Sequence, residues 1–282
     1  MKELLPLVQS YTKNSTDIIQ DLKELTLPGN AKLFSADATS MYTNIDMTLG
    51  LETLKDFLCT NSTNISPTFP THLFLQVMEV VMRNNIFSFQ DTYWLQTSGT
   101  AMGTPVACAY AMVTYGHYEN STILLNFKAN LLYYRRYIDD IFGIWIPLST
   151  KNNTERWEQF KNQLNSWVSL KWVIEEPTHN TNFLDLTLTI SESKVITITF
   201  QKDMNLYLYI PAGSAHPPSC LKGLITGEMR RYWIQNNLSD FETILSKFIQ
   251  RLSERGHNIK NLIPIFHNAA ASLDSPITAK KR

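Results

Sequence analysis

Apolar residues recur at helical spacing in the first third of the chain. The amphipathic segment 1–28 is expected to be helical up to Pro28-Gly29, a pair that breaks helices. Apolar positions three and four residues apart predict further helices from Leu49 to Leu58 and from Thr71 to Met82. The segment between them, 61–70, is rich in Ser, Thr, Asn and Pro and is expected to be a loop.

Strands are predicted where apolar and β-branched residues cluster or alternate with polar ones. A short strand over 32–36 leads into Asp37, and 133–146 is expected to form a hairpin of two apolar strands with a pair of aspartates at its tip. The segment 182–190 alternates with period two and is expected to be one half-buried strand. After a turn, 195–200 alternates again, which predicts a second antiparallel hairpin.

The last third of the chain has a helical pattern. A helix is expected from Trp157 to Val168, and helices follow Pro217-Pro218. The most clearly marked one has a capping box at Ser239 and Glu242 and ends at Gly256, where a left-handed residue commonly follows a helix. Helices and antiparallel hairpins together predict the α+β class.

Composition limits the class of protein. The 282 residues are 44% hydrophobic and 18% charged, which excludes intrinsic disorder. Three widely separated cysteines form neither a disulfide framework nor a zinc motif, and we expect reduced thiols in an intracellular protein. The longest apolar stretch, 101–115, is too short to cross a bilayer, so no contact with a membrane is expected.

The net charge of zero hides an uneven distribution. Residues 1–100 hold 6 basic and 10 acidic side chains, 101–200 hold 8 and 9, and 201–282 hold 11 and 6. The positive C-terminal part, with its tail 280–282, is suited to contact a polyanion. A solvated helical face with a basic tail is the alternative, because Lys and Arg are surface residues in most proteins.

The adjacent carboxylates of Asp139 and Asp140 stand between two apolar strands. Like charges this close raise the pKa of one partner unless water or a cation neutralises them, so the pair indicates a metal site. A tight turn surrounded by water is the alternative, since Asp is common in turns.

Asp37 stands in a similar position, at the end of an apolar strand. If its strand lies beside the predicted hairpin, Asp37 meets Asp139, and their oxygens suit Mg²⁺. Two such metals can activate an attacking hydroxyl and stabilise a leaving oxygen, as nucleotidyl transfer requires. The alternative for Asp37 alone is the N-cap of a helix.

The loop 96–107 contains two glycines and several small residues before a helix that is expected to begin near Pro105. Such a loop lets the backbone approach a flat ligand such as a base pair. Close packing of two elements is the other explanation.

These motifs stand in a distinctive order: Asp-x4-Tyr from Asp37, Gly-Thr-Ala-Met-Gly-Thr-Pro from Gly99, and Tyr-x-Asp-Asp from Tyr137. In this order they resemble the palm of reverse transcriptases, and most closely the Penelope-like element branch. The resemblance extends to Asn-Phe-Leu-Asp-Leu at 182–186, Ser-Ala-His-Pro at 214–217 and Arg-Gly-His at 255–257. It covers roughly residues 1–266.

The resemblance implies an RNA-directed DNA polymerase, in which a primer 3′-hydroxyl attacks a deoxynucleoside triphosphate on an RNA template. Two Mg²⁺ ions, or Mn²⁺ in their place, are held by the catalytic carboxylates Asp37, Asp139 and Asp140 and by the carbonyl of Ala38. Residues that contact the incoming nucleotide are Tyr42, which excludes a 2′-hydroxyl, and Met102 and Gly103. The primer and template contact Tyr137, Phe183, Leu184, Lys247, Arg251 and Arg255.

The resemblance also implies a right-hand polymerase palm followed by a helical thumb. A helical lead-in is expected over 1–30, and the palm over 31–205 with a helical insertion at about 49–95. A basic, thumb-like helical region is expected over 206–282. By the same resemblance, the nucleus is one place where such a retroelement protein acts.

The chain lacks the Leu-Pro-Lys and Arg-Pro-Ile motifs of the family's fingers region, whose basic side chains hold the triphosphate. A fingers segment supplied by a second chain or an upstream frame is therefore an expected partner, as is a separate endonuclease. The alternative function is a truncated remnant that binds nucleic acid without catalysis.

Overall fold

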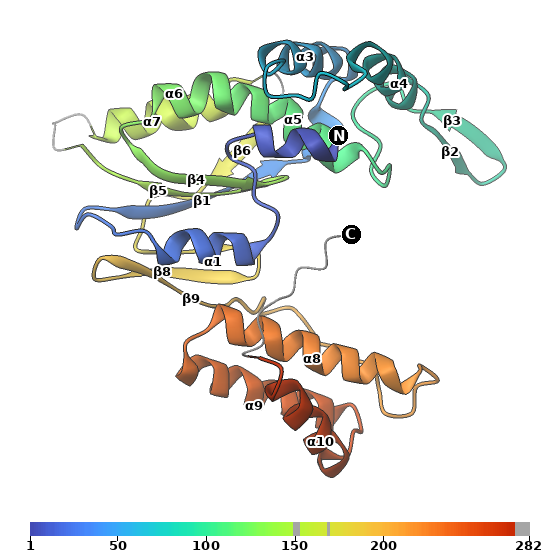
Figure 1. The fold of residues 1–282 in the computed structure, drawn as a ribbon, viewed down its shortest axis with the longest axis vertical. Helices are drawn as coiled ribbons and strands as arrows, with labels where there is room; N and C mark the ends of the chain where they lie inside the picture. Colours follow the sequence, from blue (N-terminus) through green and yellow to red (C-terminus); the bar gives the residue numbers. More distant parts are fainter. Residues whose placement is uncertain (149–152, 168–169, 274–282) are drawn as a thin grey trace.

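A four-stranded antiparallel sheet forms the centre of the molecule. The structure, a computed structural model, describes residues 1–148, 153–167 and 170–273. The strands lie side by side in the order β4 (Leu131–Tyr137), β5 (Asp140–Trp145), β1 (Lys32–Thr39) and β6 (Lys171–Ile174). Figure 1 shows helices above this sheet and a smaller sheet below it. The expected α+β class is confirmed in this coarse form.

The predicted strand at 32–36 and the predicted hairpin at 133–146 are both confirmed. β4 and β5 pair in an antiparallel register and are joined by the two-residue turn Ile138-Asp139. Asp140 is the first residue of β5 rather than part of the turn. β1 lies between β5 and β6, so a strand from early in the chain becomes a central strand of the sheet.

The upper face of the sheet is covered by α5 (Ala107–Tyr118), the π-helical turn η2 (Glu119–Ile123), α6 (Leu124–Asn126) and α7 (Asn153–Leu164). Phe34 of β1 packs edge-on against the rings of Trp157 and Phe160 of α7, at centroid distances of 5.2 and 5.3 Å. Gly143 of β5 faces Phe34, and a Cβ atom at 143 would lie 2.3 Å from that ring. The predicted helix 157–168 is shifted in the structure: α7 begins at Asn153 and ends at Leu164, and Val168 lies outside the described residues.

The lower face is covered by a three-stranded sheet and by α1 (Ser15–Lys23). The strands are β7 (Asn180–Phe183), β8 (Leu186–Ser191) and β9 (Lys194–Thr199). Their apolar side chains meet those of β1 and β5, as in the contact between Phe183 and Phe142 at 5.7 Å.

The prediction of one strand over 182–190 is wrong. The chain turns at Leu184-Asp185, where Leu184 has a φ of 54°, and β7 and β8 pair with Phe183 opposite Leu186. Leu184 in the turn continues the apolar alternation of Leu186 and Leu188, which hid the reversal in the sequence pattern. The buried positions in fact change parity across the turn, from Thr181 and Phe183 to Leu186 and Leu188. The turn before 195–200 is confirmed, with Ser191 opposite Lys194.

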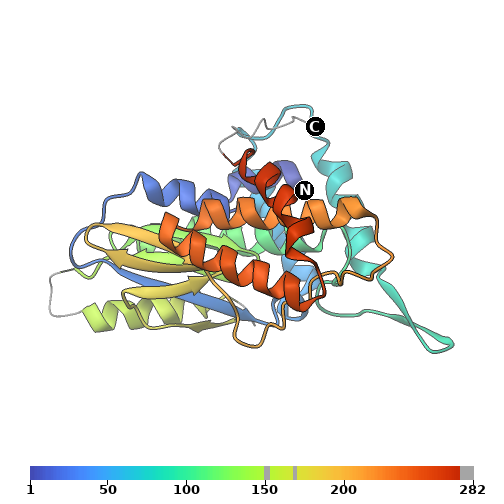
Figure 2. The same cartoon turned by 90° about the horizontal axis from the view of Figure 1, so that it is seen from below.

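Three helices follow below the small sheet: α8 (Pro218–Gln235), α9 (Leu238–Glu254) and α10 (Ile259–Ala270). Figure 2 shows them packed together, in orange and red, across the underside of the molecule. Their shared core includes Tyr232 and Phe248. The basic tail 280–282 lies outside the described residues.

The predicted helix after Ser239 is confirmed, but its predicted capping box is wrong. Asn237, not Ser239, is the N-cap, and its side chain accepts a hydrogen bond from the Asp240 N–H. Asn is as good an N-cap as Ser, so the sequence offered two possible N-caps only two residues apart. Gly256 follows the helix with a φ of 86°, as predicted.

The predicted helices at 49–58 and 71–82 are confirmed as α3 (Met47–Thr60) and α4 (Thr71–Arg83). An unforeseen hairpin, β2 (Ile86–Phe89) with β3 (Thr92–Leu95), follows them and projects from the molecule (Figure 1). The stretch 49–95 is therefore helical only in part.

The prediction of a continuous helical segment over 1–28 is wrong. A 3₁₀ helix, η1 (Lys2–Leu7), is separated from α1 by an extended stretch that lies along β4. There the Arg136 N–H donates to the Ser10 carbonyl (2.6 Å) and the Thr12 N–H donates to the Arg136 carbonyl (3.2 Å). Pairing with a strand more than 120 residues away is invisible to local periodicity. In the part of the chain that the structure describes, no helix is long and apolar enough to cross a membrane.

Candidate active site

The pairing of β1 with β5 places two of the predicted aspartates face to face. Asp37 is directly opposite Asp140 in the antiparallel register. Because side chains alternate along a strand, Asp37 shares the lower face of the sheet with Leu33 and Ser35. The small sheet covers this face at Leu33, whereas Asp37 is exposed at the other end of the strand.

The electrostatic environment of this pair disfavours two negative charges. Burial, followed by the charges of Asp139 and Asp37, raises the pKa of Asp140 to about 6. Burial and then the charge of Asp139 raise the pKa of Asp37 as well. In its protonated form Asp140 donates a hydrogen bond to Asp37. Oxygen donors that hold excess negative charge have the chemistry that a divalent cation prefers.

Asp139 lies in the turn beside this pair. Its carbonyl accepts a hydrogen bond from the Ala38 N–H at 2.8 Å, so the Ala38 backbone faces the tip of the hairpin. The sequence led us to expect Asp37 and Asp139 to meet, and Asp139 is close enough for its charge to raise the pKa of Asp37. The residue directly opposite Asp37 is Asp140. Among the described residues, no three His, Cys, Asp or Glu side chains are arranged to hold a metal ion. The structure thus brings Asp37 and Asp140 together as a pair, with Asp139 nearby.

A cavity of about 260 Å³ opens beside Asp37 and Asp140. Phe183 and Leu184, both singled out from the sequence, line it, and so does Lys202, which was not. The positive charge of Lys202 lowers the pKa of both aspartates, against the stronger effect of burial. Lys202 follows the strand predicted over 195–200, so a correct register for that hairpin could have placed it here.

Phe183 and Leu184 have different surroundings. Phe183 is buried against Phe142, whereas Leu184 is half-buried and occupies the turn between β7 and β8. Tyr137, opposite Asp140 at the end of β4, is also half-buried. The structure therefore brings these three residues near the aspartate pair.

The tip of the β7–β8 hairpin is bound to helix α8. The Asp185 carboxylate accepts a hydrogen bond of 2.5 Å from the buried Gln235 side chain and lies 3.7 Å from an Arg231 nitrogen. Gln235 also accepts a bond from the Thr199 hydroxyl at 2.8 Å. One wall of the cavity is thus joined to the C-terminal helices.

Tyr42 lies in the short helix α2 (Met41–Asn44), directly after β1. Its hydroxyl contacts the Cys108 Sγ of α5 at 3.1 Å, and burial is the main cause that raises its pKa. The Thr100 N–H donates to the Tyr42 carbonyl at 2.6 Å, so the glycine-rich loop packs on this helix. Met102 is 71% exposed, and Gly103 has a φ of 93°.

The three basic residues predicted to contact nucleic acid are on α9 or at its end. Lys247 is exposed. Arg251 stacks on the Tyr207 ring, 3.6 Å from its centroid, and Arg255 donates to the Tyr209 carbonyl at 2.8 Å. Both arginines thus hold the segment that precedes α8. None of the three lines the cavity beside Asp37, as far as the described residues show.

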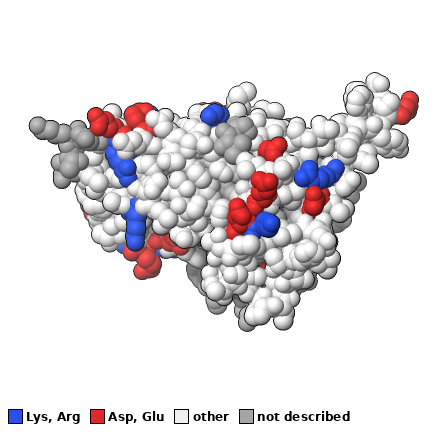
Figure 3. All heavy atoms as spheres, turned by 90° about the horizontal axis from the view of Figure 1, so that it is seen from above, with Lys and Arg blue, Asp and Glu red and all other residues white. Residues whose placement is uncertain are grey.

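The face of the molecule seen from above has few charges. Figure 3 shows isolated basic and acidic groups there, separated by broad uncharged areas. Since nucleic-acid contacts need concentrated positive charge, this face is poorly suited to them.

Comparisons with known proteins identify the fold. No protein-family model matches the chain, and no curated protein matches its sequence. Among solved structures, telomerase from Candida albicans in complex with a fragment of telomeric RNA superposes with a TM-score of 0.65 at 10% identity, covering 96% of this chain and 50% of that one. The RNA-dependent RNA polymerase of a human picobirnavirus has a TM-score of 0.57 at 10% identity, covering 96% of this chain and 51% of the polymerase.

A third structure, the RNA-dependent RNA polymerase of BmCPV at the elongation state, has a TM-score of 0.55 at 12% identity and covers 79% of this chain and 20% of that one. The chain therefore has a polymerase-like fold. It spans about half the length of the first two neighbours and a fifth of the third.

Proposed function

We propose that the chain is the palm and thumb of a reverse transcriptase of the Penelope-like type, which extends a DNA primer on an RNA template. The observation that carries this proposal is the register that pairs Asp37 with Asp140 at the open end of the central sheet, in a polymerase-like fold. The order of motifs along the chain supports the assignment to reverse transcriptases.

The residues around the pair fit a divalent metal. Asp37 and Asp140 supply carboxylate oxygens, and burial, followed by the charge of the neighbouring Asp139, raises the pKa of both. We assign Asp139 and the Ala38 carbonyl as further ligands, because the Ala38–Asp139 backbone contact lies at the same place. Two bound Mg²⁺ ions would supply activation of the primer hydroxyl and stabilisation of the leaving pyrophosphate.

The surrounding side chains suit the two substrates. The cavity walls Phe183 and Leu184 offer apolar support to the last primer nucleotide, and Lys202 offers a charge to its phosphate. Tyr42 is the proposed floor under the deoxyribose, and the loop at Met102 and Gly103 contacts the new base pair.

We assign the template and primer backbone to the region 206–282. Lys247 is exposed and free to approach phosphates from α9, while Arg251 and Arg255 support the segment beneath it. The stretch 31–205 is then the palm. The triphosphate contacts of a fingers segment would come from another chain or from a longer form of this one.

Primer extension on an RNA template with deoxynucleotides and Mg²⁺ tests the proposal. Asp139→Ala is expected to lower extension by roughly a thousandfold or more, as loss of a group that acts on the reacting atoms does. The matched control is Asp91→Ala, because Asp91 is the second residue of the equivalent two-residue turn between β2 and β3. Wild-type activity in Asp139→Ala would refute the site.

The second candidate is a nucleic-acid-binding protein without catalysis. It is favoured by the absence, among the described side chains, of a three-residue metal group. It predicts that the wild-type chain binds a primer–template duplex but does not extend it, even when the missing fingers segment is supplied.

A further inference from the structure

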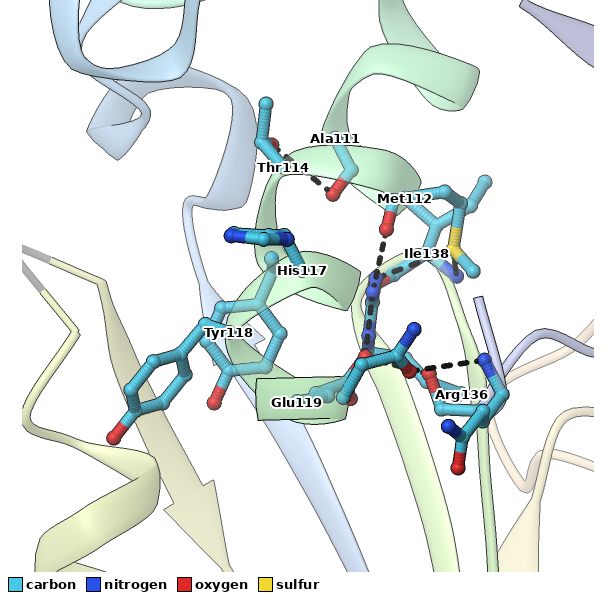
Figure 4. A network of polar contacts seen from close by, with 12 residues as sticks. Ala111, Met112, Thr114, His117, Tyr118, Glu119, Arg136 and Ile138 are labelled. Atoms are coloured by element: carbon cyan, nitrogen blue, oxygen red, sulfur yellow. Dashed lines mark hydrogen bonds and ion pairs between the residues drawn. The ribbon is translucent and has the colours of Figure 1, made fainter. Parts of the chain in front are cut away.

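A buried ion pair lies next to the aspartate hairpin, and neither partner belongs to the candidate site. Arg136 of β4 and Glu119 of η2 are both 0% exposed. The Arg136 Nε donates to one Glu119 oxygen at 2.9 Å and its Nη2 to the other at 2.8 Å, a two-pronged contact. Figure 4 shows the pair between α5 and the end of β4.

Glu119 is fully engaged at this position. Its two oxygens also accept hydrogen bonds from the Ser10 hydroxyl at 2.5 Å and the Tyr134 hydroxyl at 2.8 Å. The π-helical turn begins at Glu119, and such turns are often found at functional sites. The carboxylate therefore holds the guanidinium in one orientation.

Arg136 also donates to the turn of the hairpin and to helix α5. Its Nη1 donates to the Ile138 carbonyl at 2.8 Å, and its Nη2 donates to the Met112 carbonyl at 2.8 Å. The Ile138 N–H in turn donates to the Met112 Sδ at 3.1 Å. The carbonyl of Ile138 is thus hydrogen-bonded to Arg136 and its N–H to Met112 of α5 (Figure 4).

Ile138 needs this support because of its conformation. It has a φ of 53°, which a β-branched residue rarely adopts and which glycine adopts readily. Glycine is the usual residue where the first turn position has a positive φ. The turn Ile138-Asp139 sets the direction of the Asp139 carbonyl, which binds the Ala38 N–H, and of the aspartates themselves.

We propose that Arg136, oriented by Glu119, is a positioning residue that keeps the strained Ile138 turn, and through it Asp139 and Asp140, in place for catalysis. The role rests on the function proposed above. Lys cannot replace Arg here, because an ammonium on a flexible stem cannot hold Glu119 and the two carbonyls at once.

Amide hydrogen exchange tests the positioning independently of activity. In Arg136→Lys, exchange is expected to become faster at Ile138 and Ala38, while the middle of the β4–β5 ladder stays protected. The control is Arg135→Lys, since the neighbouring Arg135 is 31% exposed and pairs with Asp21 away from the turn. Unchanged exchange at the turn overturns the proposal. If Arg136→Lys does not fold, Glu119→Gln is examined in the same way.

Primer extension with a rescue tests the consequence. Arg136→Lys is expected to lower the extension rate roughly ten- to a hundredfold, as small misplacements of reacting groups do. Adding Ile138→Gly, which adopts the turn without support, should bring the rate to within about threefold of Ile138→Gly alone. If Arg136 had only a structural role, Ile138→Gly would not restore the extension rate of Arg136→Lys. That result would overturn the proposal.

The two hypotheses fail in different ways. If the wild-type chain does not extend primers, the proposed polymerase activity fails, while the exchange experiment still decides whether Arg136 holds the turn. If the wild type is active but Ile138→Gly does not rescue Arg136→Lys, only the positioning role fails.

Discussion

At the scale of single residues, the candidate site is built from side chains whose charges work against folding. Asp37 and Asp140 are directly opposite each other in a sheet, with Asp139 next to them. Like charges in this position destabilise a sheet. Lys202 lowers the pKa of Asp140, but burial and the charges of Asp139 and Asp37 outweigh it.

Asp140→Asn is therefore expected to stabilise the metal-free protein, by about 0.5–1 kcal/mol in the free energy of unfolding. The amide keeps the shape of the side chain and removes one of the facing charges. Denaturant unfolding without metal measures this. Mg²⁺ should then raise the melting temperature of the wild type and not of Asp140→Asn. The control is Asp91→Asn, and a less stable Asp140→Asn protein would contradict the prediction.

Tyr42→Ala is expected to relax the choice of sugar. If the ring lies under the deoxyribose, its loss opens room for a 2′-hydroxyl and weakens discrimination against ribonucleotides by about 10–100-fold, the range of a single steric contact. Competition between deoxynucleotides and ribonucleotides in primer extension measures the ratio. Tyr42→Phe keeps the ring and loses only the contact with Cys108, so it should retain the discrimination. Equal effects of both variants would show that the ring has no such role.

At the scale of elements, the turns and loops determine how the strands present these residues. Four two-residue hairpin turns have a non-glycine residue with positive φ at their first position: Gln90, Ile138, Leu184 and Glu192. The right-handed twist of paired strands favours such turns. Non-glycine residues therefore occupy this unfavourable backbone conformation in the turns that set the register of the hairpins.

The glycine loop before α5 offers a matched pair of substitutions. Gly99 and Gly103 both have positive φ, but a Cβ at 99 would lie 2.9 Å from Thr43 Cα, whereas one at 103 would meet nothing within 4 Å. Gly103→Ala should thus cost about 1–2 kcal/mol of stability for its backbone alone. Gly99→Ala should cost about 1–3 kcal/mol more because of the clash. Thermal or denaturant unfolding compares the two, and equal costs would contradict the proposed contact with α2.

At the scale of the whole molecule, Asp185 links the cavity to the C-terminal helices. It joins the β7–β8 turn to Gln235 and Arg231 of α8. The connection is one of the contacts that fix α8 relative to the aspartate pair, and so, in the proposed function, where a bound duplex would meet the site.

Asp185→Ala is expected to leave the buried Gln235 amide without this acceptor, at a cost of about 1–3 kcal/mol in stability. Primer extension should then stop after fewer nucleotides, since α8 loses its contact with the cavity wall and is held there only by its bonds to β9. Product lengths under single-encounter conditions measure this. The control is Asp203→Ala, an acidic residue in the exposed segment after β9. Product lengths that stay at the wild-type value in Asp185→Ala would show that the link has no part in holding the duplex.

Local patterns in the sequence were sufficient for much of the secondary structure. The strand before Asp37, the hairpin around Asp139 and the helices α3, α4 and α9 follow from periodicity and from turn or cap residues within a few positions. The candidate residues Asp37 and Asp140 were found in the same way, because each stands at the end of an apolar strand with a clear local signal. Tyr42 was found only through its place in the order of motifs.

Other features depend on contacts between distant parts of the chain, and only the tertiary structure decided them. Strand pairing placed Asp140 rather than Asp139 opposite Asp37, and pairing with β4 drew residues 10–12 out of the expected helical segment. The reversal at Leu184 moves the buried positions from odd to even residue numbers, and the pair of Arg136 with Glu119 joins β4 to the end of α5. Register, strand order and buried polar pairs are set by packing over long separations, and a local hydrophobic pattern carries no information about them.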